Sequence, residues 1–442
     1  VREVSAAAGR VKQLVKTSDG EYIIEVPRNK KEHAASPHKV SWDVSHEKAH
    51  LTMLNDRRNS LVKIKDVKAD GRVIAPCVME DSIKVNRSSG YLDRFKSRLC
   101  YDEARVTKVK AKLGRQEYHH LYSNDTDQMA FKMFIGDAVI DQDDVTGADL
   151  PDAYWQADRM HTEHCWMHTY EPLYDEEGDQ LCYQCGAPVN GERTAGSDYH
   201  IWRDGVFEKA GCTQSITCLG TFFKEDADGN RATVITCSDD FLIKETKGNN
   251  KRLANSILDA FDTHMQQHGA KVKRFDRPSA FMGYGLAWSR DNSVCTLHMT
   301  SHIEQLAAKW IPDLLDGGKP EDIVSGNKLC QMADRMVMVD PRPHVLGKQQ
   351  KQVQQMGGGI KYIETAVSPR VSRLMHKISC VSAASPPDAH AVCRSVIAIL
   401  YSNKHEGITF GGGGLSPRVL LQGGMYANLV LADGAPPALE GM

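Results

Sequence analysis

The chain has 442 residues, 41% hydrophobic and 25% charged, a balance typical of globular rather than disordered proteins. No apolar run is long enough to cross a bilayer, so no membrane span is expected. The length exceeds one ordinary hydrophobic core and predicts two to four structural units. The chain starts at Val1 without a signal-peptide pattern, which predicts an internal piece of a longer protein acting in the cytoplasm or nucleus.

The net charge of −2 conceals a strong asymmetry along the chain. Residues 1–120 carry 25 Lys and Arg against 16 Asp and Glu, whereas residues 121–200 carry 3 against 17. A basic part beside an acidic part suits a protein that binds phosphates with one and divalent cations with the other. Two oppositely charged surfaces that only face solvent or attract each other are the alternative, and composition favours neither.

The first hundred residues predict a short lead-in and a small basic sheet. Residues 1–40 are expected to be weakly structured, with one strand-like run at 22–26. A helix is expected over 42–54, where apolar residues recur roughly on one face. Alternating segments then predict strands at 61–64, 72–74 and 95–100.

The rest of the chain predicts strands that run into acidic turns, followed mainly by helices. Strands are expected at 139–140 and 234–237, each leading into carboxylates. The helical pattern is clearest over 251–268. The other expected elements are a short helix at 203–210, strands at 281–285 and 295–297, a helix at 301–310, and mostly helical residues at 360–402.

Two apolar segments that end in paired carboxylates are the strongest chemical signal. They are AVIDQDDV at 138–145 and VITCSDDFL at 234–242. Divalent cations prefer hard oxygen ligands, and carboxylates at the ends of neighbouring strands supply them. Two such strands side by side would bring Asp144 opposite Asp239 and Asp240. Each Asp-Asp pair alone is better explained as a turn or a helix cap, so the signal depends on their combination.

Further motifs around these two segments follow the order found in one family. QDDVTGA at 142–148 resembles a motif of Gln, any residue, Asp, Val and a short step to Ala, and Ser238–Asp240 stands where that family has Val-Asp-Asp. The other similar segments are FKSRL at 95–99, NGERTAG at 190–196, GCTQS at 211–215, FMGY at 281–284, HMTSHI at 298–303 and the stretch from 362 to 410. In this order the segments resemble the reverse transcriptases of copia-type LTR retrotransposons.

This resemblance implies an α+β chain with the right-hand polymerase fold. It predicts fingers, a palm with an antiparallel sheet, a thumb, and a helical connection-like region at the C-terminus. The implied boundaries are 1–41 for the lead-in, 42–135 for the fingers, 136–295 for the palm with part of the fingers, 296–345 for the thumb and 346–442 for the connection-like region. The family's RNase H domain would start about where this sequence ends, so no RNase H activity is expected.

The resemblance also implies an RNA-directed DNA polymerase that extends a primer 3′ end with dNTPs. The implied catalytic and metal-binding residues are Asp144, Asp239 and Asp240, with Mg²⁺ as the ion and Mn²⁺ as a substitute. The implied nucleotide- and phosphate-binding positions are Lys96, Arg98, Gly191 and Arg193, together with Asp149. Expected partners are an RNA template, a DNA primer and dNTPs, but no membrane; partner subunits or a homodimer are left open.

The sequence departs from the family pattern inside the predicted nucleotide pocket. Five residues after Asp144 the family has an aromatic side chain that packs under the sugar and excludes the 2′-hydroxyl, but this chain has Asp149. A carboxylate there would repel a triphosphate, unless a shifted loop lets Tyr154 or Trp155 take the role. Cys237 replaces the family's aromatic residue before the paired aspartates.

A cluster of His and Cys residues offers a competing zinc hypothesis. His161, His164, Cys165 and His168 precede Cys182 and Cys185, and all are plausible zinc ligands. If 165–170 and 181–185 form a hairpin, however, Cys182 and Cys185 point to opposite faces of a strand. Ordinary strand cysteines are therefore the favoured interpretation.

Two alternatives to the enzyme remain open from the sequence. One is a retrotransposon-derived chain without catalysis that serves as a structural or RNA-binding subunit of a larger assembly. Asp149 favours this alternative. The other is a zinc-dependent nucleic-acid-binding protein, which depends entirely on the His and Cys cluster.

Overall fold

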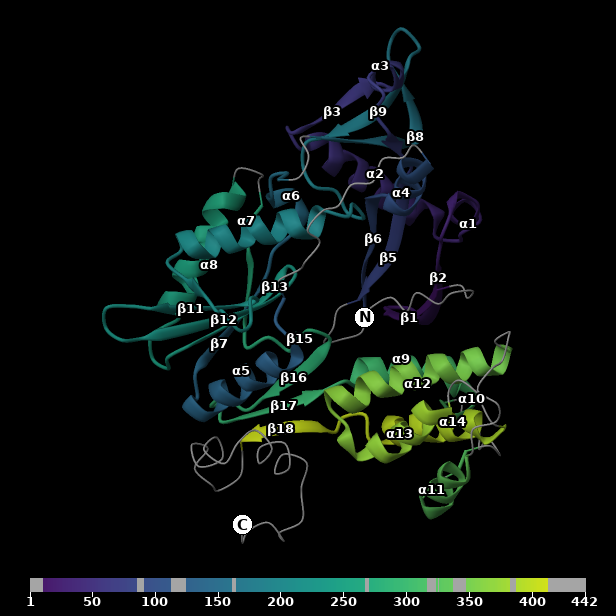
Figure 1. Cartoon of the computed structure of the whole chain (residues 1–442), viewed down its shortest axis with the longest axis vertical. Coiled ribbons are helices and arrows are strands. Elements are labelled where there is room, and N and C mark those ends of the chain that lie inside the picture. The colour runs from purple at the N-terminus through teal and green to yellow at the C-terminus, as the bar shows by residue number, and fades with distance from the viewer. Residues whose placement is uncertain are drawn as a thin grey trace.

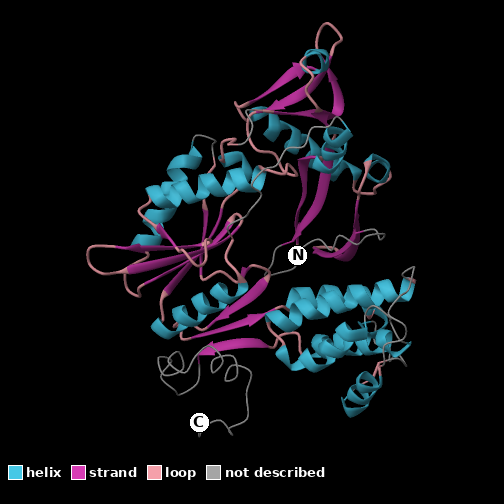
Figure 2. Ribbon diagram, viewed as in Figure 1, coloured by secondary structure: helices cyan, strands magenta, loops and turns pink. Residues whose placement is uncertain are grey.

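In the computed structural model of the chain, the described residues form three sheets of four or more strands, which are stacked with their helices along the long axis (Figure 1). We name these the upper, central and lower sheets, as they appear in Figure 1. The structure describes residues 11–85, 91–112, 125–160, 164–266, 270–315, 323–324, 326–336, 347–381 and 387–411. Figure 2 shows that strands and helices are mixed in the upper and central parts, whereas the lower part has a group of helices beside its sheet. Among the described residues, no helix combines the length and apolarity needed to span a lipid bilayer.

The upper sheet has four strands in the order β3-β9-β8-β4, and β4 alone runs parallel to its neighbour. Its strands are β3 (Asn59–Lys63), β4 (Ile74–Ala75), β8 (Cys165–Tyr174) and β9 (Gln180–Cys185). The helices of this part are α1 (Lys30–Ala34), α2 (Lys39–Asn55), α3 (Ile64–Ala69) and α4 (Glu103–Lys112). The expected hairpin at 165–170 and 181–185 is thus confirmed as β8 and β9.

Two antiparallel hairpins accompany the upper sheet. They are β1 (Val11–Thr17) with β2 (Gly20–Val26), and β5 (Cys77–Val85) with β6 (Leu92–Tyr101). Helix α2 packs against β6, and Trp42 at its start is fully buried beside Phe95. Residues 11–26 therefore form a defined hairpin, more ordered than the weakly structured lead-in that the sequence predicts.

The central sheet is a six-stranded antiparallel sheet in the order β10-β11-β12-β13-β7-β14. Its strands are β7 (Asp144–Asp149), β10 (Thr213–Gln214), β11 (Thr221–Glu225), β12 (Arg231–Cys237), β13 (Asp240–Glu245) and β14 (Lys273–Asp276). One face packs on α7 (Ala195–Lys209) and α8 (Arg252–Met265), and the other on α5 (Gln128–Asp141). The short helix α6 (Ala153–Gln156) follows β7 and contacts α7.

The lower sheet joins strands that are far apart in sequence. Its order is β15-β16-β17-β18, with β15 (Ala280–Phe281), β16 (Tyr284–Trp288), β17 (Val294–His298) and β18 (Gly407–Gly411). Its helices are α9 (Thr300–Trp310), α10 (Pro312–Leu315), α11 (Gly326–Arg335), α12 (Lys348–Ala366), the 3-10 helix η2 (Pro369–Val371), α13 (Ser372–Val381) and α14 (Pro387–Ser402). One hydrophobic core runs through these helices, the lower sheet and α5.

One expected strand is a helix. Val139 and Ile140 lie in the last turn of α5, which ends where Gln142 adopts a left-handed conformation with φ 53°. Phe131, Phe134 and Ile135 are buried on the same helix, at spacings of three and four residues. The prediction of a strand at 139–140 is wrong, because a two-residue apolar run does not distinguish a strand from the end of a buried helix.

The prediction of a mixed α and β chain is confirmed. The right-hand polymerase arrangement and the boundaries at 41, 135, 295 and 345 stay predictions. Helices on both sides of residue 345 belong to the same hydrophobic core, since α9 packs against α12 and α14.

Phe261 on α8 offers a test of the packing behind the central sheet. Its side chain is fully buried and contacts the rings of Trp202, Phe207 and Phe241. We expect Phe261→Ala to lower the free energy of unfolding by about 3–5 kcal/mol, because it leaves a cavity. Urea unfolding measures this, with Phe275→Ala at a 46% exposed position as the control. Equal losses in the two variants would contradict the packing described here.

Candidate functional site

The register between β7 and β13 brings two aspartates together at one end of the central sheet. Asp149, the last residue of β7, lies directly opposite Asp240, the first residue of β13. Directly opposed residues of antiparallel strands are about 4.5–5.5 Å apart at Cα, with side chains on the same face. Asp239 precedes Asp240 on the two-residue turn between β12 and β13. Three carboxylates therefore gather here: Asp149, Asp239 and Asp240.

Asp144 is not part of this group, and its predicted place opposite Asp239 and Asp240 is wrong. Asp144 begins β7 and lies opposite Glu245, at the far end of β13. Five residues of strand separate it from Asp149, which corresponds to roughly 16 Å. An odd number of steps also places its side chain on the opposite face. That face belongs to α8, because Glu245 accepts a hydrogen bond from the backbone N–H of Ala254.

With Asp149 in place of Asp144 as the first acid, the aromatic position of the family motif also moves five residues along the chain. Tyr154 stands five residues after Asp149, the spacing that the family resemblance requires between aspartate and aromatic residue. Its ring lies 5.9 Å from that of Tyr199 on α7. Burial raises the pKa of the Tyr154 hydroxyl, and so does the nearby charge of Asp239. Trp155 instead points into the upper core, so Tyr154 is the aromatic residue beside the acids.

A backbone hydrogen bond joins the end of β7 to the turn before β13. The N–H of Leu150 donates to the carbonyl of Asp239 at 2.9 Å. Leu150 follows Asp149 directly, so this bond fixes the turn against the strand end. Both segments that carry the acids are therefore held by main-chain bonds rather than by side chains alone.

The surroundings of Asp239 shift the pKa of its carboxyl. Burial raises the pKa of its carboxyl above the usual range, and the neighbouring charge of Asp149 raises it further. A backbone hydrogen bond and the charges of Arg98 and Lys96 act in the opposite direction. An acid that is desolvated beside another carboxylate gains most from an added cation.

The hairpin β5–β6 supplies the positive charge that faces these acids. Arg94, Lys96 and Arg98 alternate along β6, so they share one face of the strand. Lys84 on β5 lies opposite Arg94. Burial lowers the pKa of the Lys96 ammonium, as do Arg98 and Lys84, while the charge of Asp152 raises it. The structure thus brings Lys96 and Arg98 to the acidic end of the central sheet, although they precede Asp149 by some fifty residues.

Lys273 on the edge strand β14 also reaches the site. It lies opposite Asp149 in the register, and its Nζ is 2.5 Å from the Asp149 carboxylate. No sequence pattern indicates this contact, because Lys273 lies on a short strand in a Lys- and Arg-rich stretch. Oxygen-only donors and a partly desolvated Asp239 suit a hard divalent cation. Such an ion at Asp149 would compete with the Lys273 ammonium.

The glycine-containing segment before α7 is attached to the end of β6. Gly191 has φ +84°, and a Cβ there would lie 2.5 Å from the carbonyl oxygen of Tyr101, so only glycine fits. The N–H of Tyr101 donates to the carbonyl of Asn190 at 2.7 Å. Arg193 is exposed, and its backbone N–H donates to Glu103. Among the described interactions, none places the Arg193 guanidinium at the three acids.

Two cysteines of the zinc hypothesis, Cys182 and Cys185, lie on opposite faces of β9. Cys182 packs in a small core with Ile64 and Val67, whereas Cys185 packs in the main upper core. Cys165 lies directly opposite Cys185, on the face away from Cys182. The expected alternation is confirmed, and these thiols do not converge on one point. His161 lies outside the described residues.

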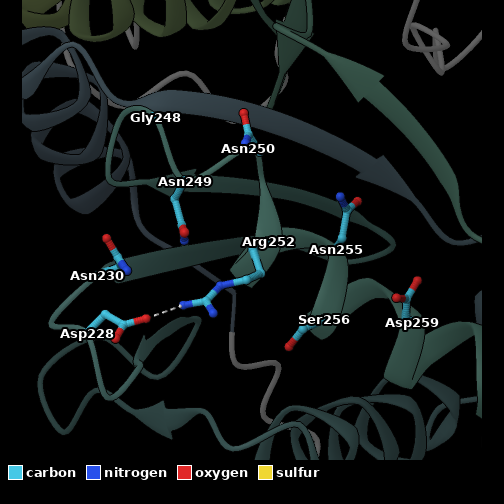
Figure 3. A pocket seen from close by; sticks show the side chains of 9 residues that line it. All are labelled: Asp228, Asn230, Gly248, Asn249, Asn250, Arg252, Asn255, Ser256 and Asp259. Carbon is cyan, nitrogen blue, oxygen red and sulfur yellow. Dashed lines mark hydrogen bonds and ion pairs between the residues drawn. The ribbon is translucent and has the colours of Figure 1, made fainter.

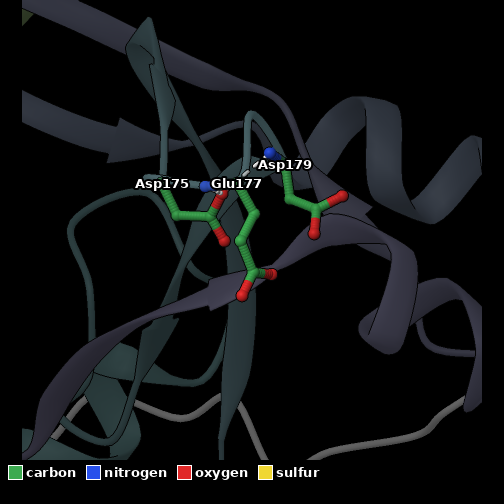
Figure 4. Close-up of side chains that lie close together, drawn as sticks. All are labelled: Asp175, Glu177 and Asp179. Carbon is green, nitrogen blue, oxygen red and sulfur yellow. Dashed lines mark hydrogen bonds between the residues drawn. The ribbon is translucent and has the colours of Figure 1, made fainter.

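A different acidic group lies on the exposed turn between β8 and β9 (Figure 4). Ligand oxygens of Asp175, Glu177 and Asp179 lie within 4.8 Å of one another, the one such group found among the described residues. Lys63 is ion-paired with all three of these acids, and Lys65 with Asp179. The geometry could accommodate a cation, but two lysines already offset most of the charge of the three acids.

A polar hollow lies near the start of α8 (Figure 3). Its lining residues are Asp228, Asn230, Gly248, Asn249, Asn250, Arg252, Asn255, Ser256 and Asp259. Arg252 is bonded there to Asp228. Glu245 accepts a hydrogen bond from the backbone N–H of Ala254 in the first turn of α8. Glu245 is the last residue of β13, whereas Asp240 is the first, so the start of α8 lies at the other end of this strand. The hollow is therefore separate from the acidic end of the sheet.

No protein-family model matches the chain, and no curated protein shows significant sequence similarity to it. The motif order in the sequence and the geometry of the central sheet are therefore the observations that bear on function. That geometry gathers three acids, a basic hairpin and one tyrosine.

Removal of the Asp239 charge should stabilise the metal-free protein at neutral pH. The raised pKa means that the folded state holds this proton more tightly than the unfolded state, so ionisation above that pKa costs folding free energy. We expect Asp239→Asn to raise the melting temperature at pH 7 in chelator. The gain should shrink as the pH falls toward the ordinary carboxyl value of about 4.

Asp149→Asn is the matched control, because the Asp149 carboxylate is paired with Lys273. This variant should show no such gain. Thermal unfolding across the pH range measures both variants. A lower melting temperature for Asp239→Asn at pH 7 would contradict the desolvation described here.

Proposed function

We propose that the chain is an RNA-directed DNA polymerase of the reverse transcriptase type, with Asp149, Asp239 and Asp240 as its acidic centre. The observation that carries this proposal is the pairing of Asp149 with Asp240 beside the Asp239 turn. The motif order also supports the proposal, since the resemblance implies one acid from the first segment and two from the second. The RNA template, DNA primer and dNTPs are the proposed partners.

The reaction joins the primer 3′ oxygen to the α-phosphorus of a dNTP and releases pyrophosphate. Two Mg²⁺ or Mn²⁺ ions bound by Asp149 and Asp239, with Asp240 beside them, would activate the 3′ hydroxyl and neutralise phosphate charge. The chain's own residues bind and orient the reactants. Their contribution is positioning and charge complementarity, which account for most of the catalysis of phosphoryl transfer.

Lys96 and Arg98 are the proposed triphosphate-binding residues. They lie on the face of β6 whose charge acts on Asp239, so a triphosphate between hairpin and acids would contact both. Arg presents a planar fork of donors that suits phosphate oxygens, and Lys adds a compact charge. Arg193 stays a weaker candidate, because the described contacts attach its backbone to Glu103.

Tyr154 is the proposed residue under the sugar. It follows Asp149 by five residues, and its ring lies beside Asp239. A ring in this position leaves no room for a 2′-hydroxyl. In this assignment Asp149 is a metal-binding acid and Tyr154 takes the aromatic position, so Asp149 is not a departure from the family pattern.

One observation favours a second candidate, a non-catalytic RNA-binding subunit. Lys273 neutralises Asp149 through a 2.5 Å ion pair, so this acid needs no metal for its charge balance. A chain of this type would bind template and primer through the basic hairpin without extending the primer. Binding without extension in Mg²⁺ and in Mn²⁺ distinguishes this candidate from the enzyme.

Primer extension on a homopolymer RNA template with a DNA primer tests the acidic centre. We expect Asp149→Asn to lower the rate by about 100-fold or more, because one oxygen ligand of the reacting centre loses its charge. Asp144→Asn makes the same chemical change on the same strand and should stay within about threefold of wild type. The reverse pattern, with Asp144→Asn inactive and Asp149→Asn active, would overturn the assignment.

Competition between dNTP and rNTP tests the sugar position. We expect Tyr154→Ala to reduce the preference for dNTP by roughly 10- to 100-fold, because a cavity admits the 2′-hydroxyl. Single-nucleotide incorporation measures kcat/KM for each substrate. Tyr174→Ala, at a 61% exposed position on β8, is the control and should leave the preference unchanged. An unchanged preference in Tyr154→Ala would remove this residue from the pocket.

A further inference from the structure

The turn that carries Asp239 is held from outside by two side chains. Ser238 has φ +53°, a left-handed conformation that non-glycine residues adopt at an energetic cost. Its backbone N–H donates to Oδ1 of Asp125 at 2.8 Å. Its carbonyl accepts from the Tyr199 hydroxyl at 3.0 Å. Both polar groups of this strained peptide are thus bound by residues distant in sequence.

Asp125 is itself fixed in place by its neighbours. The N–H of Thr126 donates to the carbonyl of Thr236 on β12 at 2.9 Å, which fixes the backbone beside the turn. The buried Arg203 guanidinium on α7 lies 3.3 Å from the Asp125 carboxylate. Arg203 also donates to Asp204 at 2.9 Å. A charged hydrogen-bond network therefore extends from α7 through Asp125 to the peptide next to Asp239.

His200 does not supply a competing cation to this network. Its Nε2 lies 3.7 Å from Oδ1 of Asp125. Burial, with the charge of Arg203, lowers the pKa of His200 to about 4, so the imidazole is neutral at pH 7. Arg203 is therefore a cation that faces the Asp125 carboxylate at neutral pH, and the same carboxylate accepts the N–H of Ser238.

We propose that Asp125, supported by Arg203, is a positioning residue that sets the Ser238–Asp239 turn and thereby the place of the Asp239 carboxylate. This inference rests on the proposed polymerase function. Without the Asp125 acceptor, the Ser238 N–H loses its partner and the left-handed turn relaxes toward a less strained conformation. Because Asp239 is the next residue, the displacement passes directly to its carboxylate.

The test compares three variants of the full chain at matched folding. Asp125→Ala removes the acceptor, and Asp125→Asn keeps an oxygen that can accept the Ser238 N–H. Asp127→Ala is the matched control from the same segment. Asp127 caps α5 through the N–H groups of Met129 and Ala130, so its loss weakens the helix without touching the turn. Steady-state extension gives kcat and KM, and titration with Mn²⁺ followed by electron paramagnetic resonance gives metal affinity.

We expect Asp125→Ala to lower kcat by about 100-fold, the scale of an ångström-sized displacement of a reacting group, with the KM for dNTP nearly unchanged. Its Mn²⁺ affinity should fall about as much as that of Asp239→Asn. Asp125→Asn should keep most of the wild-type kcat and most of the wild-type Mn²⁺ affinity. Asp127→Ala should lower the melting temperature but keep wild-type kcat and Mn²⁺ affinity.

The possible failures are distinguishable. A wild type that binds Mn²⁺ but extends no primer overturns the polymerase proposal, and Mn²⁺ affinity then decides the positioning role. An active wild type with a folded Asp125→Ala of unchanged kcat and Mn²⁺ affinity overturns the positioning role alone. Equal losses in Asp125→Ala and Asp127→Ala would also overturn it. A wild type without extension or Mn²⁺ binding overturns both.

Discussion

The pairing of β7 with β13 is the constraint on which the candidate site depends. Strand side chains alternate, so a slip of one residue would turn Asp149 away from Asp240 and expose apolar residues to the wrong face. Packing on both faces resists such a slip. Ala148 and Phe241 are buried against α7 and α8, while Leu242 is buried on the other side. The hydrophobic core thus specifies the register, and the register brings the acids together.

The clustered acids disfavour folding but favour cation binding, so the two requirements conflict at this end of the sheet. Carboxylates that lie close together and partly out of water disfavour the folded chain, yet the same desolvation strengthens their attraction for cations. The surrounding structure offsets part of the repulsion with Lys273, Lys96 and Arg98. The strained peptide at Ser238 adds a further local cost that the rest of the fold must offset.

The sequence predicted the composition of the site better than its geometry. The amphipathic helix at α8, the β12–β13 turn with Asp239 and Asp240, and the basic strand with Lys96 and Arg98 were all visible from periodicity and motif order. For the first acid, the register favours Asp149 over the predicted Asp144, five residues earlier in the chain, because Asp149 lies opposite Asp240. Four aspartates lie within residues 141–149, so the first acid of the family motif can be aligned with Asp144 or with Asp149. Only the requirement for an aromatic residue five positions later distinguishes the two alignments. Asp149 with Tyr154 satisfies that requirement.

The remaining contacts could not be predicted because they join segments without a mutual pattern. Lys273 reaches Asp149 only because β14 is added beside β7, and Asp125 reaches Ser238 only because the segment before α5 lies along β12. No local periodicity in the sequence predicts either of these two contacts. Likewise, the apolar run at Val139 and Ile140 carries no sign that it ends a helix until Phe131, Phe134 and Ile135 are considered with it.

The last strand of the lower sheet has a consequence for how the chain is made. β18 pairs with β17, although more than a hundred residues and six α-helices among the described residues separate them. During synthesis, the β17 edge must therefore wait for β18 to leave the ribosome, with its main-chain groups unpaired on that side. An open strand edge invites pairing with other chains. Nascent chains that stall before residue 407 should thus be the species most prone to self-association.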